Sequence, residues 1–160
     1  MSEVIAQLKL FFSNPIVLSC LFSWFCCQVI KTLINLFTSR ITSARDFFDL
    51  LLFRTGSMPS SHSSLVAALT TTVFFMRGLN DELTLVSLCF YLVTIRDAVG
   101  VRRASGEQAV KINEMGELLK RNGIDFEFKK IKEVQGHTPF EVFIGSLIGV
   151  FFGVLFAVIH

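Results

Sequence analysis

Two short polar motifs, each with a histidine and each leading into an apolar run, stand out in this chain of 160 residues. They are residues 54–62 (RTGSMPSSH) and residues 136–141 (GHTPFE). The first amides of a helix have no intrahelical partner and the helix dipole is positive there, so each motif suits an anion. Two imidazoles beside an anion fit phosphoryl transfer, in which one attacks phosphorus and the other protonates the leaving group. We therefore take His62 and His137 as candidate catalytic residues.

Cationic and hydroxyl side chains near the two motifs would neutralise the oxygens of a transferred phosphoryl group. Lys31 lies within an apolar stretch, where charges are costly and usually functional. Asp97 is a candidate supporting residue, and it could equally form a structural pair with Arg96 or with an incoming cation. The candidate phosphate-binding residues are Lys31, Arg54, Ser60, Ser61, Arg102 and Arg103.

The elements that must position these residues are membrane helices. Hydrophobic residues make up 52% of the chain, 18 of them phenylalanine, and they gather in long uncharged runs. The last run is long enough to cross a bilayer, which takes about 20 apolar residues. We predict an all-α integral membrane bundle, a single domain of residues 1–160 with a cytoplasmic segment over 102–138. The expected spans are about 15–37, 59–77, 81–101 and 139–160, with Pro15, Pro59 and Pro139 in the first turns of three of them.

The N-terminus shows neither a basic region nor a small-residue cleavage site, so we expect the first apolar segment to remain as a span. All four cysteines lie in apolar runs and are expected to be free thiols, and neither a metal site nor a cofactor is predicted. His160 receives no role.

Three polar segments lie between the spans. Residues 43–53 have the pattern of a short amphipathic helix at the membrane interface. Residues 104–122 predict a polar amphipathic helix ended by Gly123. Residues 126–134, in which apolar side chains alternate with charges, predict a short strand or an extended segment.

The distribution of basic residues predicts the orientation. Of the 15 lysines and arginines, eleven fall in residues 38–58 and 102–138, whereas the opposite side receives only Lys9 and Arg77. By the positive-inside rule, both histidine motifs then face the cytoplasm and the termini face outward. The basic residues that the site does not use are expected to attract anionic lipid head groups.

Three blocks of the sequence resemble a known family. They are residues 56–63 (GSMPSSHS), 97–109 (DAVGVRRASGEQA) and 136–142 (GHTPFEV). Together they are similar to a divergent branch, made of small membrane proteins, of the type 2 phosphatidic acid phosphatase superfamily, which also includes vanadium-dependent haloperoxidases. The resemblance covers about residues 28–153.

The resemblance implies a helical lipid phosphate phosphatase that uses no metal and works through a phosphohistidine. His137 would be the nucleophile, Glu141 would orient it, and His62 would be the general acid. Ser60 and Ser61 would bind phosphate through their hydroxyl groups and amides.

Two motifs of the superfamily differ in this chain. The first motif has an Arg-Pro pair that does not follow Lys31 here, so Arg54 would substitute for the arginine. The third motif has an arginine where this chain has Ile131, and Arg102 or Arg103 would supply that charge from an earlier segment.

Each candidate also has a purely structural interpretation. Residues 138–141 have the sequence of a capping box, so Glu141 would bind a backbone amide without any catalytic role. His62 and His137 would then be ordinary interfacial histidines, and Arg102-Arg103 a membrane anchor.

The predicted function is hydrolysis of a lipid phosphomonoester or pyrophosphate reached from the cytoplasmic leaflet. Two alternatives stay open: a lipid-phosphate binding or sensing protein without turnover, and a structural subunit whose basic loop docks a cytoplasmic partner. A homo-oligomer would help four spans to enclose a site. Haloperoxidase activity is the least expected, and nothing indicates nucleic acid.

Overall fold

The protein is all-helical in its regular elements, as predicted. The computed structural model describes residues 1–37, 58–124, 127–133 and 136–159, and no strand occurs among them. The interfacial helix expected over 43–53 lies outside the described residues. In chain order the elements are α1 (Ser2–Phe12), α2 (Pro15–Phe37), α4 (Ser61–Arg77), α5 (Glu82–Arg96), the π-helical turn η1 (Asp97–Val101), α6 (Arg102–Arg121) and α7 (Pro139–Ile159).

Three described helical stretches are long and apolar enough to cross a membrane: Pro15–Phe37, Glu82–Arg121 and Pro139–Ile159. The second expected span falls on α4, which has 17 residues. It begins two residues later than predicted, because Ser60 occupies the capping position and Pro59 precedes it. The protein is thus an integral membrane bundle built around these four elements.

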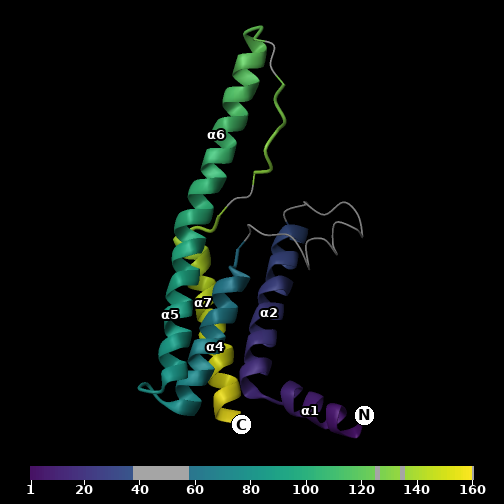
Figure 1. Cartoon of the computed structure of the whole chain (residues 1–160), viewed down its shortest axis with the longest axis vertical. Coiled ribbons are helices and arrows are strands. Elements are labelled where there is room, and N and C mark those ends of the chain that lie inside the picture. Colours follow the sequence, from purple (N-terminus) through teal and green to yellow (C-terminus); the bar gives the residue numbers. More distant parts are fainter. Residues whose placement is uncertain (38–57, 125–126, 134–135, 160) are drawn as a thin grey trace.

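The packing of α7 on α4 depends on small residues. α4 packs against α2, α5 and α7 (Figure 1). Gly145, Gly149 and Gly153 recur every fourth residue of α7 and are buried. A Cβ atom would lie 2.3 Å from the Ser60 carbonyl oxygen at Gly145 and 2.1 Å from the Ser64 carbonyl oxygen at Gly149. Close backbone approach at glycine is typical of helix pairs in membranes.

The face of α2 inside the bundle is polar, and its outer face is apolar. A hydrogen bond of 2.7 Å joins Thr72 Oγ1 to Ser19 Oγ across the α2–α4 contact. In lipid the apolar side chains need no protein cover, so small and polar groups mediate helix contacts. The buried residues of α2 are Ser19, Ser23, Cys27, Gln28, Lys31, Thr32 and Asn35.

A helical rod carries the chain out of the bundle and an extended segment brings it back. α5, η1 and α6 follow one another without a break over 40 residues, which corresponds to about 60 Å of helix. The described part of the returning segment, 127–133, runs beside α6 (Figure 1). Asn113 holds it, because its Nδ2 donates to the Ile131 carbonyl and its Oδ1 accepts from the Ile131 amide, both at 2.9 Å. Of the two forms predicted for this segment, the extended one is therefore present over 127–133.

Candidate active site

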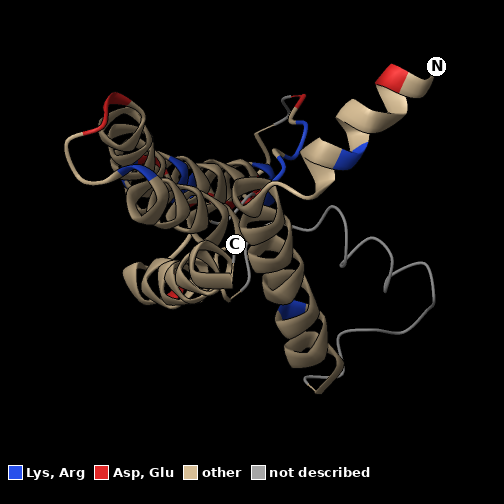
Figure 2. Ribbon diagram, turned by 90° about the horizontal axis from the view of Figure 1, so that it is seen from below, with Lys and Arg blue, Asp and Glu red and all other residues tan. Residues whose placement is uncertain are grey.

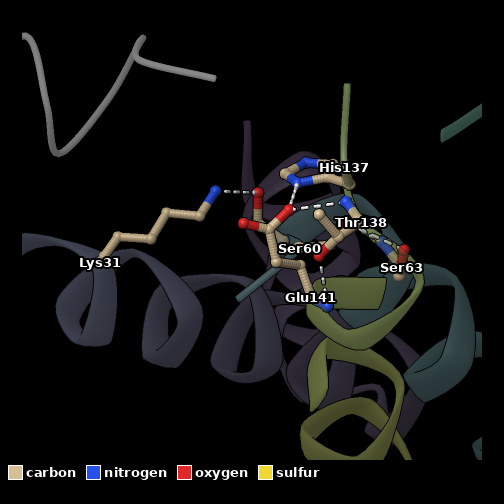
Figure 3. A network of polar contacts seen from close by, with 7 residues as sticks. Lys31, Ser60, Ser63, His137, Thr138 and Glu141 are labelled. Atoms are coloured by element: carbon tan, nitrogen blue, oxygen red, sulfur yellow. Dashed lines mark hydrogen bonds and ion pairs between the residues drawn. The ribbon is translucent and has the colours of Figure 1, made fainter. Parts of the chain in front are cut away.

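The imidazole of His137 lies directly against a carboxylate. His137 Nδ1 and Glu141 Oε2 are 3.3 Å apart, one helical turn from each other (Figure 3). His137 is only 7% exposed, so its imidazole is largely shielded from water, whereas the Glu141 side chain is 21% exposed. When Nδ1 carries the proton and donates to Glu141, the lone pair of Nε2 is left free to act as a nucleophile.

The same carboxylate also closes the capping box of α7. Glu141 Oε2 accepts from the Thr138 amide at 2.8 Å, and Thr138 Oγ1 accepts from the Glu141 amide at 3.3 Å. The sequence presented capping and orientation of the histidine as alternatives. The structure shows both contacts at once, because one oxygen reaches both donors.

The backbone around His137 is held by η1 and the first turn of α6. The His137 amide donates to the Ala98 carbonyl at 3.2 Å, and Ala98 belongs to η1. A Cβ atom on Gly136 would lie 2.3 Å from the Arg103 nitrogen, so only glycine permits this approach. π-Helical turns of this kind are frequent at functional sites.

The first motif is joined to the second at the top of α4. The Ser60 amide donates to the Glu141 carbonyl at 3.1 Å, while the Ser60 hydroxyl accepts from the Ser63 amide at 3.4 Å and pairs with the Ser63 hydroxyl at 2.9 Å. The Ser60 amide thus joins α4 to α7, whereas the Ser60 hydroxyl caps the start of α4. Its expected contact with phosphate stays a prediction.

Lys31 reaches this cluster from α2. It is 2% exposed, and its Nζ donates to the Ser61 hydroxyl at 3.2 Å (Figure 3). Burial of an ammonium group is costly and usually functional in a membrane protein. The loosely corresponding lysine of the first motif therefore does lie at the site, beside the serine that was expected to bind phosphate.

The second histidine shares this environment. His62 is exposed in the first turn of α4, and its electrostatic neighbours include Arg102, Lys31 and His137. Lys31 and Arg102 also act on His137. The structure therefore brings two imidazoles and two cations from four separate segments to one end of the bundle.

The remaining candidates differ in position. Arg102 Nε donates to Asp97 Oδ2 at 2.5 Å, so Asp97 pairs with the cation that enters the site and not with Arg96. Arg103 instead donates to Glu107 at 3.0 Å. Arg54 lies outside the described residues.

The position that corresponds to the third-motif arginine lies far along the rod. Ile131 is bound to Asn113, about 16 Å of helix from Arg102. Lys130, its neighbour, donates to Glu117 at 3.2 Å, still farther out. Of the basic residues considered for that lost charge, Arg102 is the one whose charge acts on both histidines.

Burial sets the protonation of His137. Desolvation lowers its pKa below the ordinary value, and the charge of Lys31 lowers it further, whereas the hydrogen bond to Glu141 raises it. Desolvation is the largest of these effects, so the pKa is lowered overall. The neutral form, which a nucleophile requires, is favoured.

A groove lies beside the site at membrane depth. It has a volume of about 220 Å³ between α5 and α7. Ser146 lines it, is 8% exposed, and its Oγ has no hydrogen-bond partner among the described residues. The other lining residues are Tyr91, Ile95, Val99, Pro139, Val142 and Phe143.

The cysteines form no disulfide among the described residues. All four are free thiols, as expected. In the part of the chain that the structure describes, no group of three or more histidine, cysteine or acidic side chains is arranged to hold a metal ion.

Comparison with known proteins identifies the family of the chain. A family model described as the divergent PAP2 family matches residues 12–152, which is most of the chain. The protein belongs to the divergent PAP2 family. It is also 42% identical over 133 residues to a Bacillus subtilis (strain 168) protein named "Uncharacterized membrane protein YuiD", covering 77% of this chain and 81% of that protein. No solved structure matches the chain.

Membership of the divergent PAP2 family confirms the resemblance inferred from the three blocks. Three contributions to the site were nevertheless missed: the Ser63 hydroxyl, the Ala98 carbonyl and the Ser146 hydroxyl. The serine run 60–64 was a visible signal for Ser63, since hydroxyl groups cap helices. No signal existed for Ala98, because its contact with His137 spans 39 residues of chain.

Proposed function

We propose that this divergent PAP2 protein hydrolyses a phosphate ester or anhydride of a membrane lipid. The observation that carries the proposal is the His137–Glu141 contact at 3.3 Å, with His62, Lys31 and Arg102 as neighbours. A buried, oriented imidazole, a second imidazole and two cations are the groups that transfer of a phosphoryl group through histidine requires.

In the first step, His137 Nε2 would attack phosphorus while Glu141 holds the Nδ1 proton. The bond between phosphorus and the leaving oxygen breaks. His62, whose protonated form the negative charge of the bound phosphoryl group would favour, gives its proton to that oxygen. Lys31 and Arg102 would balance the charge on the other phosphoryl oxygens. The products are a lipid alcohol, or a lipid monophosphate from a pyrophosphate, and phosphohistidine.

In the second step, water would attack the phosphohistidine. Neutral His62 takes a proton from that water, the N–P bond breaks, and Nε2 recovers its lone pair. Inorganic phosphate leaves, and both histidines return to their starting protonation states. Over the two steps, one water molecule hydrolyses one ester or anhydride bond.

The position of the site supports a lipid as substrate. His137 lies just before a helix able to span the bilayer, and the groove between α5 and α7 reaches Pro139, two residues away. An apolar slot of about 220 Å³ beside a cationic site suits a hydrocarbon chain attached to a phosphate. The basic residues of 102–138 favour a cytoplasmic location for this end of the bundle.

The direct test is phosphate release by purified protein in mixed micelles. The panel contains phosphatidic acid, phosphatidylglycerol phosphate, and polyprenyl phosphate and diphosphate, with a chelator present throughout. We expect release from at least one lipid, abolished by His137→Ala and by His62→Ala. No release from any of them by folded protein would overturn the proposal.

A second test separates a lipid substrate from a soluble one. Ser146→Leu should fill the groove and reduce turnover of a long-chain lipid phosphate by about tenfold or more, which corresponds to about 1.4 kcal/mol. Turnover of a short soluble phosphate ester by the same variant should change little. An equal loss for both substrates would contradict the role of the groove.

One observation favours an alternative, a lipid-phosphate binding protein without turnover. The third-motif position, Ile131, lies along the rod and not at the site, and Arg103 pairs with Glu107. A cage with fewer cations would still bind an anion but would stabilise the transition state less. This alternative predicts saturable vanadate binding without hydrolysis, and it predicts that His137→Gln keeps that binding.

A further inference from the structure

The helix α1 presents an apolar face that no part of the described bundle covers. None of its residues is buried, and Val4, Ile5, Leu8, Phe11 and Phe12 are all at least half exposed. At 100° per residue, these five side chains fall within about one third of the helix circumference. Such a narrow apolar sector is typical of an amphipathic helix.

An uncovered helix of this length needs a partner. α1 has 11 residues, and isolated helices shorter than about 12–15 residues are marginal in water. Its helical form therefore depends on an apolar environment along the exposed sector. Its contacts with α2 are few, so the bundle itself does not supply that environment.

The corner between α1 and α2 determines where that sector lies. Only Ser13 and Asn14 separate the two helices. The Ser13 hydroxyl donates to the Lys9 carbonyl at 2.8 Å, and Asn14 Oδ1 accepts from the Ile16 amide at 2.9 Å, so one residue closes α1 and the next caps α2. Because α2 is a membrane span that begins at Pro15, the C-terminal end of α1 must lie at the level of the bilayer surface.

The direction of α1 follows that surface. It runs across the axis of α2 and away from the bundle, at the end opposite the α6 rod (Figures 1 and 2). Glu3 and Lys9 are its two charged side chains, and they cancel. A helix that lies along a membrane without net charge binds through apolar area and not through attraction to anionic lipids.

We propose that α1 is an interfacial helix whose apolar sector lies in the head-group and acyl boundary of the leaflet opposite the candidate active site. The family model matches from residue 12 onward, so this helix lies almost wholly outside the family's shared region. The proposal stands on the packing of α1 alone and does not depend on any catalytic activity.

Tryptophan fluorescence of the full chain in lipid vesicles tests the proposal. Trp24 is first replaced by phenylalanine, and one of two substitutions is then introduced: Phe11→Trp, inside the apolar sector, or Leu10→Trp, outside it and about 100° around the helix. With brominated lipids, Phe11→Trp should be quenched at least twofold more strongly than Leu10→Trp. Acrylamide in the water should quench them in the reverse order. The ratio of lipid quenching between the two variants should be the same in phosphatidylcholine vesicles with and without phosphatidylglycerol.

Three results would overturn the proposal. Equal quenching of both positions by brominated lipid would mean that α1 has no membrane-facing side. Protection of Phe11→Trp from both quenchers would indicate that protein, such as a second copy of the chain, covers the sector. Quenching by lipid that requires phosphatidylglycerol would mean that charge and not apolar area drives the contact.

Discussion

His137 Nδ1 lies 3.3 Å from Glu141 Oε2, and that oxygen also accepts the Thr138 amide at 2.8 Å. The carboxylate that caps α7 is therefore the one that orients the candidate nucleophile. The capping bond fixes Glu141 in the first turn, and Glu141 in turn fixes the imidazole. One carboxylate thus makes both a capping contact and a contact with the candidate nucleophile, and substitutions can separate the two.

Glu141→Gln should separate the two roles. Glutamine also serves as the reciprocal partner in a capping box, so the start of α7 is kept. The charge that stabilises the imidazolium and holds the Nδ1 proton is lost. We expect phosphate release to fall by about 10²-fold or more while the thermal midpoint changes little. Thr138→Ala is the control, because it removes the cap at a cost of about 1 kcal/mol and leaves the carboxylate in place. A larger loss of activity in Thr138→Ala than in Glu141→Gln would contradict the assignment.

The stability of the protein should depend on the pH around His137. Burial lowers the pKa of His137 in the folded protein, whereas in the unfolded chain it is about 6.5. Below about pH 6.5 His137 takes up a proton more readily in the unfolded chain than in the folded protein. The free energy of unfolding is therefore highest above about pH 6.5 and decreases as the pH falls below that value. The thermal midpoint of the wild type in detergent should therefore drop on acidification more than that of His137→Gln. Parallel curves for the two proteins would show that His137 is not the group responsible.

Lys31 should contribute to ligand binding at the expense of stability. It is 2% exposed and its Nζ contacts the Ser61 hydroxyl, so burial of its charge costs stability and would be offset by an anion bound beside it. Lys31→Met should weaken vanadate binding by about tenfold or more, while thermal stability stays equal or rises. The matched control is Lys120→Met, an exposed lysine near the end of α6. Normal vanadate affinity in Lys31→Met would remove this residue from the site.

The contact between α7 and α4 should tolerate no side chain at Gly149. A Cβ atom there would lie 2.1 Å from the Ser64 carbonyl oxygen, so the helices must separate. Gly149→Ala should destabilise the protein by about 1–3 kcal/mol and displace His137 from the Ser60–Lys31 side of the site. Gly100→Ala is the control, because no atom lies within 4 Å of the Cβ it would gain and alanine favours helix. Thermal unfolding in detergent measures the stability of both variants. Equal midpoints for Gly149→Ala and Gly100→Ala would contradict the packing argument.

The membrane helices could be predicted well from the sequence alone. α2 and α7 begin at Pro15 and Pro139 as predicted, because proline suits the first turn and the uncharged runs behind them can only be buried or placed in lipid. Family membership was likewise visible in the short polar blocks. The helix α1 was missed, since its 11 residues are too few for a span and its pattern was not recognised.

The candidate site was determined only in part by sequence. His62, His137 and Glu141 could be named because each sits at the start of a helix in a recognisable motif. Which cations act on them depended on the fold. The returning segment bonds Ile131 and Lys130 to residues far along α6. Arg102, at the start of α6, acts on both histidines, and η1 gives the Ala98 carbonyl to His137.

Local composition thus determined which segments become helices and where they start, because capping, proline and apolar runs act over a few residues. Only the tertiary structure decided that Lys31 points inward, that Glu141 contacts both a backbone amide and an imidazole, and that the charge of Arg102 acts on both histidines. Those relationships depend on packing between helices far apart in the chain, where a glycine on one helix allows a carbonyl on another to approach. No local pattern encodes such distances.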